Sequence, residues 1–124
     1  MEDTMERIYI ISRYRARTGS GQRFNCQVAQ YICRQVAAAG GVPVAPHLFY
    51  TQFLDDSYED DRERGITFGL DDLSRSNEYL LIVIDGVISA GMKRELAEAA
   101  RLNMRGHIIS MTHEEIRRLM KVVR

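Results

Sequence analysis

The 124-residue sequence has few of the residues that crosslink a small protein or carry it through a membrane. It contains two cysteines, two prolines and no tryptophan, and no apolar run approaches the roughly 20 residues of a membrane-spanning helix. Lys plus Arg and Asp plus Glu number 17 each, so there is no overall charge to attract a nucleic-acid polymer or an anionic membrane. We therefore expect neither as a partner, and any recognition of charge must be local.

The cysteines and histidines exclude two further classes of site. Cys26 and Cys33 lie seven residues apart in a helical pattern, which separates them by about 10 Å, too far for a disulfide. The three histidines and two cysteines show no metal-ligand spacing, so we expect no metal and no other cofactor. The first residues lack a basic region followed by a signal-like apolar segment, which predicts a cytoplasmic protein.

The sequence does have 45% apolar residues, enough for one core, and strand patterns that alternate with helix patterns. Strands are expected at 7–12, 42–46, 79–85 and 106–111, and helices at 24–39, about 57–76, 90–103 and 112–122, with a long loop at 47–56. Capping boxes are predicted at Ser57 with Asp60 and at Thr112 with Glu115. This alternation predicts the α/β class: a flavodoxin-like, three-layer fold with a small parallel sheet and helices on both faces, as a single domain over residues 1–124.

In such folds ligands bind beyond the carboxyl ends of the strands, so the segments after Ser12, Pro46 and Ile84 should share one cleft. The candidate side chains in these segments are Arg13, Tyr14, Arg15, Arg17, His47, Asp85 and Ser89. The Arg- and Gly-rich segment 12–25 suits an anion such as phosphate, although a solvated loop explains it equally well and it is not a P-loop. His47 fits either a ligand contact or a structural role in a turn.

Glu95 is unusual within its predicted helix because no cation lies three or four residues away. Glu98, by contrast, can pair with Arg94 and Arg101 as a solvated surface charge. Gly91, one turn before Glu95, removes a side chain from the same stripe and would let a ligand approach the carboxylate. The pattern fits a ligand-facing carboxylate, and it fits an exposed glutamate on a polar face as well.

The pattern "DGVISAGMKRELAEA" resembles the nucleoside 2-deoxyribosyltransferase-like superfamily, which includes 2'-deoxynucleoside 5'-phosphate N-hydrolases. The segments "YIISRYRA", "VPVAPHLFYTQFLDD", "DRERGITFGLDDLSRSNE" and "ISAGMKRE" resemble an uncharacterised bacterial and phage branch of it. The resemblance implies that Glu95 is the nucleophile and that Tyr9 assists this carboxylate. It also implies that Ser12 and Arg13 bind a phosphate, with Ser89 and Gly91 around the other end of the substrate.

One position departs from the pattern of this superfamily. Its enzymes carry an aspartate on the helix before the central strand, and Gly69 stands in that place. Asp72, one turn further, shares the stripe of Gly65 and Gly69 and is the expected substitute. A departing base usually needs a proton, which Asp72 or Asp85 would supply, although an aspartate at a strand end also suits a capping role.

These observations predict an enzyme that cleaves or transfers an N-glycosidic bond of a nucleoside or nucleotide, through a glutamate nucleophile and a covalent glycosyl-enzyme. The alternative is a protein that binds and sequesters a nucleotide or nucleotide-sugar in the same cleft without turning it over. Gly69 favours the binding protein, whereas Glu95 and Tyr9 favour the enzyme. By the resemblance, the protein is expected to form a homodimer or a higher homo-oligomer.

Overall fold

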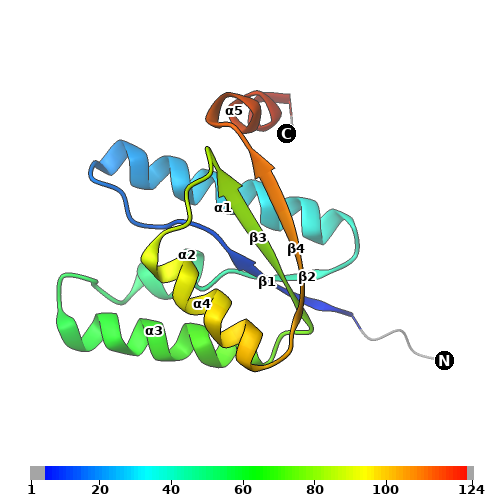
Figure 1. Ribbon diagram of the computed structural model, residues 1–124. Helices are drawn as coiled ribbons and strands as arrows, with labels where there is room; N and C mark the ends of the chain where they lie inside the picture. Colours follow the sequence, from blue (N-terminus) through cyan, green and yellow to red (C-terminus); the bar gives the residue numbers. More distant parts are fainter. Residues whose placement is uncertain (1–4, 123–124) are drawn as a thin grey trace.

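A four-stranded parallel sheet in the order β2-β1-β3-β4 organises the computed structural model, which describes residues 5–122 (Figure 1). The strands are β1 (Arg7–Ile11), β2 (Val42–Val44), β3 (Glu78–Ile84) and β4 (Arg105–Met111). The helices are α1 (Gly19–Ala38), α2 (Pro46–Phe49), the 3-10 helix η1 (Tyr50–Gln52), α3 (Glu59–Ser74), α4 (Ala90–Arg101) and α5 (His113–Val122). The predicted α/β, flavodoxin-like fold is confirmed.

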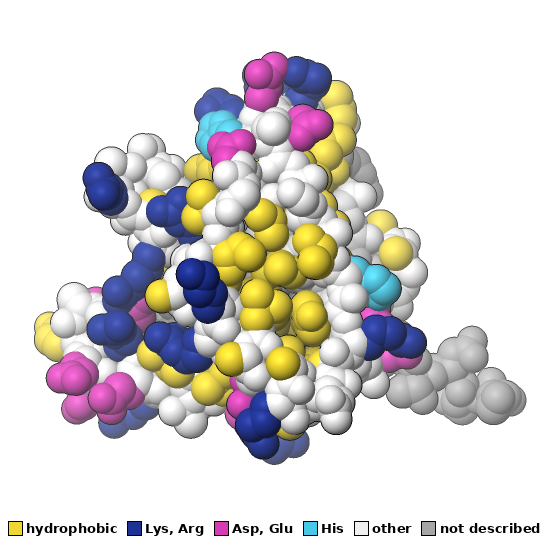
Figure 2. Space-filling view, viewed as in Figure 1, with side chains coloured by type: hydrophobic (Ala, Val, Ile, Leu, Met, Phe, Trp, Pro, Cys, Tyr) yellow, Lys and Arg dark blue, Asp and Glu magenta, His cyan; other side chains and the backbone are white. Residues whose placement is uncertain are grey.

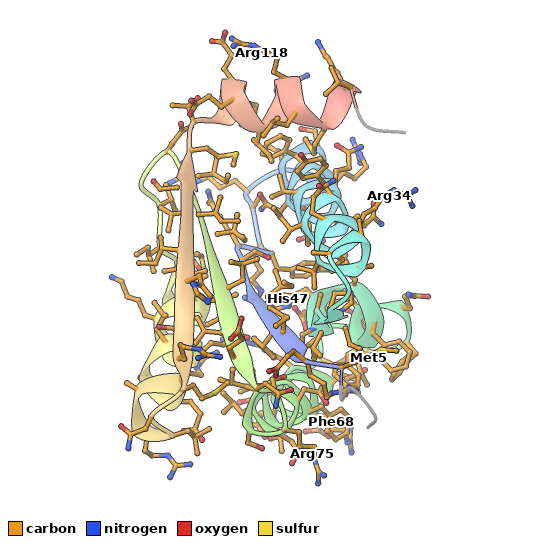
Figure 3. The ribbon with its side chains drawn as sticks, turned by 90° about the vertical axis from the view of Figure 1, so that its right-hand side faces the viewer. Met5, Arg34, His47, Phe68, Arg75 and Arg118 are labelled. Carbon is orange, nitrogen blue, oxygen red and sulfur yellow. The ribbon has the colours of Figure 1, made fainter. Side chains whose placement is uncertain are left out.

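Alternate side chains of the inner strands β1 and β3 build a separate core on each face of the sheet. Tyr9 and Ile11 pack with α3 and α4, whereas Ile10 packs with α1 and α5. Figure 3 shows the sheet nearly edge-on, with helices on both sides. Because both faces of β3 are covered, its sequence is almost wholly apolar, as predicted for a central strand.

The first two connections contain more helix than the sequence predicted. Helix α1 begins at Gly19, five residues before the expected start, because the Thr18 hydroxyl accepts a hydrogen bond from the Gly21 amide at 3.0 Å. The segment expected to be a loop contains α2 and η1, and Pro46 opens α2 instead of ending β2. Proline suits this position because its fixed φ matches the first helical residue, where an amide hydrogen is not needed.

The two predicted capping boxes had different outcomes. Thr112 and Glu115 form theirs at the start of α5, with reciprocal bonds of 2.8 and 3.1 Å. The box predicted at Ser57 is wrong, because the Ser57 amide and hydroxyl both donate to Oδ1 of Asp55, at 2.9 and 2.7 Å. Helix α3 therefore begins at Glu59 without a side-chain cap, although its acidic first turn still suits the helix dipole.

Strand β4 forms an edge of the sheet, and its side toward α4 is open. Ile109 packs into the core with α1 and α5, so its neighbour Ile108 points to the opposite face, where it is 68% exposed. Figure 2 shows apolar side chains gathered on this face of the molecule, beside α4. Within residues 5–122, no helix has both the length and the apolar character needed to cross a membrane.

Candidate active site

A cavity of about 280 Å³ lies at the carboxyl end of β1, on the side of the sheet that α3 and α4 cover. Its walls come from the segment after β1, from α2 and η1, from α3, and from the first turns of α4. Nine of the residues that the sequence singled out line it: Tyr9, Ser12, Tyr14, Arg15, His47, Gly69, Ser89, Gly91 and Glu95. Their roles stay predictions, but the fold brings them together around one space.

Tyr9 and Glu95 form a hydrogen-bonded pair in the wall of this cavity. Tyr9 is completely buried on β1, and its hydroxyl donates to Oε2 of Glu95 on α4. Burial raises the pKa of Glu95 to about 7, while the bond from Tyr9 and the positive charge of Arg94 act in the opposite direction. The pKa of Tyr9 is raised by burial and by Glu95, so the phenol keeps its proton and remains the donor.

The start of α4 leaves space beside the carboxylate. Ser89 caps the helix, and its hydroxyl accepts a hydrogen bond from the Met92 amide at 3.2 Å. A Cβ atom placed on Gly91 would meet nothing closer than the Ser89 hydroxyl at 4.0 Å. The space next to Glu95 is thus open to a ligand, and the first turn of a helix favours negative charge there.

Gly69 lies in the cavity wall, but Asp72 does not. A Cβ atom on Gly69 would lie 3.5 Å from the Tyr9 hydroxyl, so a side chain at this position would point toward the Tyr9–Glu95 pair. The carboxylate of Asp72 instead accepts a hydrogen bond from Tyr50 at 2.7 Å, and this bond raises the pKa of Tyr50 to about 12. Tyr50 lines the cavity, so any influence of Asp72 on a ligand would have to pass through it.

Three arginines, Arg15, Arg62 and Arg94, also line the cavity. Arg15 lies 3.6 Å from Asp56, whereas no ion pair of the other two is found among residues 5–122. Among the lining residues that the sequence interpretation missed, four have ionisable side chains: Tyr50, Asp56, Arg62 and Arg94. The sequence did contain a signal for Arg62. Residues 62, 65 and 69 share one helical stripe, and Gly69 on that stripe was already a candidate for the site.

His47 and Tyr14 stack on each other, with ring centroids 4.9 Å apart. Burial lowers the pKa of His47, so the imidazole is neutral near pH 7. The stack ties α2 to the segment after β1, which fits the structural reading of His47, while both rings also line the cavity. Both readings that the sequence left open for His47 are compatible with this position.

Arg13 and Asp85 lie at a second cavity, on the side of the sheet that α1 and α5 cover. Asp85 adopts a positive φ of 53°, and its Oδ1 accepts a hydrogen bond from the His113 amide at 3.0 Å. Asp85 therefore has a capping role, as the alternative predicted, but it caps the start of α5 instead of the turn that follows β3. Ser12 lines both cavities and marks the boundary between them.

Comparison with solved structures assigns the architecture to the class of 2-deoxyribosyltransferase folds. The chain is similar to a 2-deoxyribosyltransferase from Bacillus psychrosaccharolyticus, with a TM-score of 0.69 and 13% sequence identity, over 84% of this chain and 72% of that chain. The chain belongs to the family described as domain of unknown function DUF7768, whose model matches residues 6–109. No curated protein sequence shows significant similarity to it.

Proposed function

We propose that this protein breaks an N-glycosidic bond of a nucleoside or nucleotide, with Glu95 as the nucleophile. The observation that carries the proposal is the Tyr9–Glu95 pair, in which a buried phenol holds a half-buried carboxylate in the wall of a cavity. Glu95 is half-buried and takes part in no ion pair with a described residue, whereas a structural carboxylate withdrawn from water is normally paired. The 2-deoxyribosyltransferase-like fold supports this class of reaction.

In the proposed reaction, the ionised Glu95 attacks the anomeric carbon of the sugar. A carbon–oxygen bond to the carboxylate forms while the carbon–nitrogen bond breaks, and the electron pair leaves with the base, which takes up a proton from solvent. Water, or a second base, then attacks the anomeric carbon and loses a proton to solvent, while the carbon–oxygen bond to Glu95 breaks and the carboxylate is regenerated. The Tyr9 hydroxyl keeps the carboxylate oriented in both steps, because it remains a donor throughout.

The arginines of the cavity favour a nucleoside 5'-monophosphate over an uncharged nucleoside. Arg62 and Arg94 bring two guanidinium groups to the cavity, and the start of α4 adds the positive end of a helix dipole. Apolar walls at Pro46, Ile66 and Leu70 suit the sugar and base. We propose that the phosphate lies on the arginine side and the anomeric carbon beside Glu95.

A binding function without turnover is the second candidate, and Gly69 favours it. The position expected to carry an aspartate carries no side chain, and neither Asp72 nor Asp85 lines the cavity. Asp56 is the only other carboxylate that lines it within residues 5–122, and it lies 3.6 Å from Arg15. With no acid held close to the departing base, such a site would hold a nucleotide without cleaving it.

The experiment that separates these functions is incubation with ribo- and deoxyribonucleosides and their 5'-monophosphates, with base release followed by chromatography. Release by the wild type and none by Glu95→Gln is expected, and a second base added to the mixture distinguishes transfer from hydrolysis. Tight binding of a nucleotide by calorimetry, with no release from any compound, would instead establish the sequestering function. Neither binding nor release would refute both.

We propose a second copy of this chain as the macromolecular partner. The support is apolar surface: Val87 and Ile88 precede Ser89 at the start of α4, and they and Ile108 are each at least 36% exposed. Ile108→Asp is expected to convert a dimer to a monomer, as measured by size-exclusion chromatography coupled to light scattering. The substitution leaves the core intact, because the core residue of this pair is the neighbouring Ile109. A monomeric wild type at the highest concentration tested would contradict this assembly.

A further inference from the structure

The second cavity, on the α1 and α5 side of the sheet, has no role in the proposed reaction. It has a volume of about 370 Å³ and is bounded by the ends of β1 and β3, the start of α1, and α5. Glu95 and Tyr9 do not line it. We propose that it is a separate site for the phosphate group of a small phosphate ester.

The start of α1 directs positive charge at this cavity. Thr18, Ser20 and Gly21 line it, and no acidic residue stands in the first turn of this 20-residue helix. The amide of Gly21 bonds to the Thr18 hydroxyl at 3.0 Å, whereas the amide of Ser20 finds no acceptor among residues 5–122. A helix start with a free amide and no carboxylate of its own favours a phosphate.

Ser12 gives the independent sign of a ligand. It is 6% exposed, and its hydroxyl has no hydrogen-bond partner within the described chain. Every fully inaccessible side-chain nitrogen or oxygen of those residues is hydrogen-bonded, so the Ser12 hydroxyl must keep access to cavity space. Ser12 directly follows the last residue of β1, and continued alternation would turn it to the side of Ile10 and α1, where it lines this second cavity at its boundary with the first.

Arg13 and Arg117 supply the charge that a phosphate requires. They line the cavity from the segment after β1 and from α5, and neither forms an ion pair with another described residue. Asp85 is the one carboxylate in the lining of this cavity, and its Oδ1 is occupied by the His113 amide. Two guanidinium groups and a helix start outweigh that single charge, and guanidinium pairs well with phosphate.

The floor of the cavity selects an ester over free phosphate. Val28, Ile82 and Ile84 line it, and Phe24 stacks on His113 with ring centroids 4.1 Å apart. These apolar surfaces offer contact to the carbon part of a ligand whose phosphate is held at the start of α1. We expect phenyl phosphate to bind more tightly than inorganic phosphate.

Calorimetric titration with these two probes tests the site, and Arg117→Gln is the diagnostic variant. Loss of one charge-assisted contact is expected to weaken phenyl phosphate binding about tenfold or more. Arg118→Gln is the matched control, because Arg118 is the next residue of α5 and points away from the molecule in Figure 3. Its affinity should equal that of the wild type.

Amide chemical shifts locate the bound probe. Saturable shifts at Ser20 and Gly21 that weaken in Arg117→Gln but not in Arg118→Gln would support the site, whatever happens at Glu95. Shifts confined to Ser89 and Gly91 would overturn it, because the anion would then occupy only the first cavity. Absence of saturable binding, or phenyl phosphate binding no better than inorganic phosphate, would also overturn the proposal. None of these readouts requires turnover, so failure of this site and failure of the proposed reaction are distinguishable.

Discussion

Glu95 and Glu98 lie three residues apart on α4, yet their carboxyl groups experience opposite environments. Glu98 accepts two hydrogen bonds from Arg101, at 2.9 and 2.6 Å, and these lower its pKa. Glu95 meets Tyr9 in the wall of the cavity, and burial raises its pKa to about 7. One helix thus carries an ordinary surface charge and a carboxyl poised to change charge near neutral pH, and the face of the helix decides which is which.

The largest difference between the Glu95 and Glu98 variants is expected in the rate of base release. Glu95→Gln should lower base release by about a thousandfold or more, because an amide cannot act as the nucleophile. Glu98→Gln should leave kcat/KM close to that of the wild type, since it removes only a solvated ion pair. Equal rates for wild type and Glu95→Gln would contradict the proposed role of Glu95, provided that circular dichroism confirms that the variant is folded.

The change in the free energy of unfolding caused by each Gln substitution should have opposite signs at the two glutamates. The folded pKa of Glu95, about 7, lies above its usual value of 4.5, so the folded state binds the proton more tightly and loses stability as the pH rises through this range. Glu95→Gln should therefore be more stable than the wild type at about pH 8, by up to about 3 kcal/mol, since one pKa unit is worth about 1.4 kcal/mol. The gain should shrink to below about 1 kcal/mol near pH 5.

Glu98→Gln should show the reverse dependence. The pKa of Glu98 is lowered in the folded protein, so its contribution is present above its usual pKa and is lost as the pH falls. The variant should be slightly less stable than the wild type at neutral pH and equal to it in acid. Urea denaturation of both variants across this range is the measurement, and a gain of stability in Glu98→Gln at high pH would contradict the assignment.

Tyr9→Phe tests how the half-buried Glu95 carboxyl is held. The hydrogen bond from Tyr9 lowers the pKa of Glu95, so its loss should raise that pKa further and move the acidic limb of the kcat/KM profile to higher pH. Activity near pH 7 should fall by about tenfold. Tyr50→Phe is the matched control, because Tyr50 also lines the cavity but bonds to Asp72. An unmoved limb in Tyr9→Phe would contradict the role of the bond.

The contrast within α4 was visible in the sequence, because it depends on neighbours along one helix. Helical spacing gave Glu98 a cation and left Glu95 without one, and Arg101 is the partner that the structure places there. The order of strand and helix was predictable for a related reason, since burial of both faces of β3 requires an apolar run. Local periodicity carries this information without any long-range contact.

The positions of Asp72 and Asp85 depended on segments that no local pattern could place. Asp72 lies on the predicted helix, but Tyr50 comes from the segment expected to be a loop and occupies its carboxylate. Asp85 follows β3 as predicted, but its positive φ turns it to the start of α5 on the other face of the sheet. The position of a residue at a strand end predicts the edge of the sheet at which it lies. It does not predict the face of the sheet toward which its side chain points.

Arg94→Gln gives the smallest expected effect and refines the contrast between the two glutamates. The positive charge of Arg94 lowers the pKa of Glu95 less than the bond from Tyr9 does, and the Arg94 side chain is exposed. Its removal should therefore raise the pKa of Glu95 only slightly, as followed by carbon NMR of the carboxyl groups. Salt at about 1 M should abolish this difference by screening, whereas the shift caused by Tyr9→Phe should persist. Lys93→Gln, the same loss of charge one residue earlier, should leave the pKa of Glu95 unchanged, and an equal shift in both variants would show that Glu95 responds to the net charge of α4 instead of to Arg94.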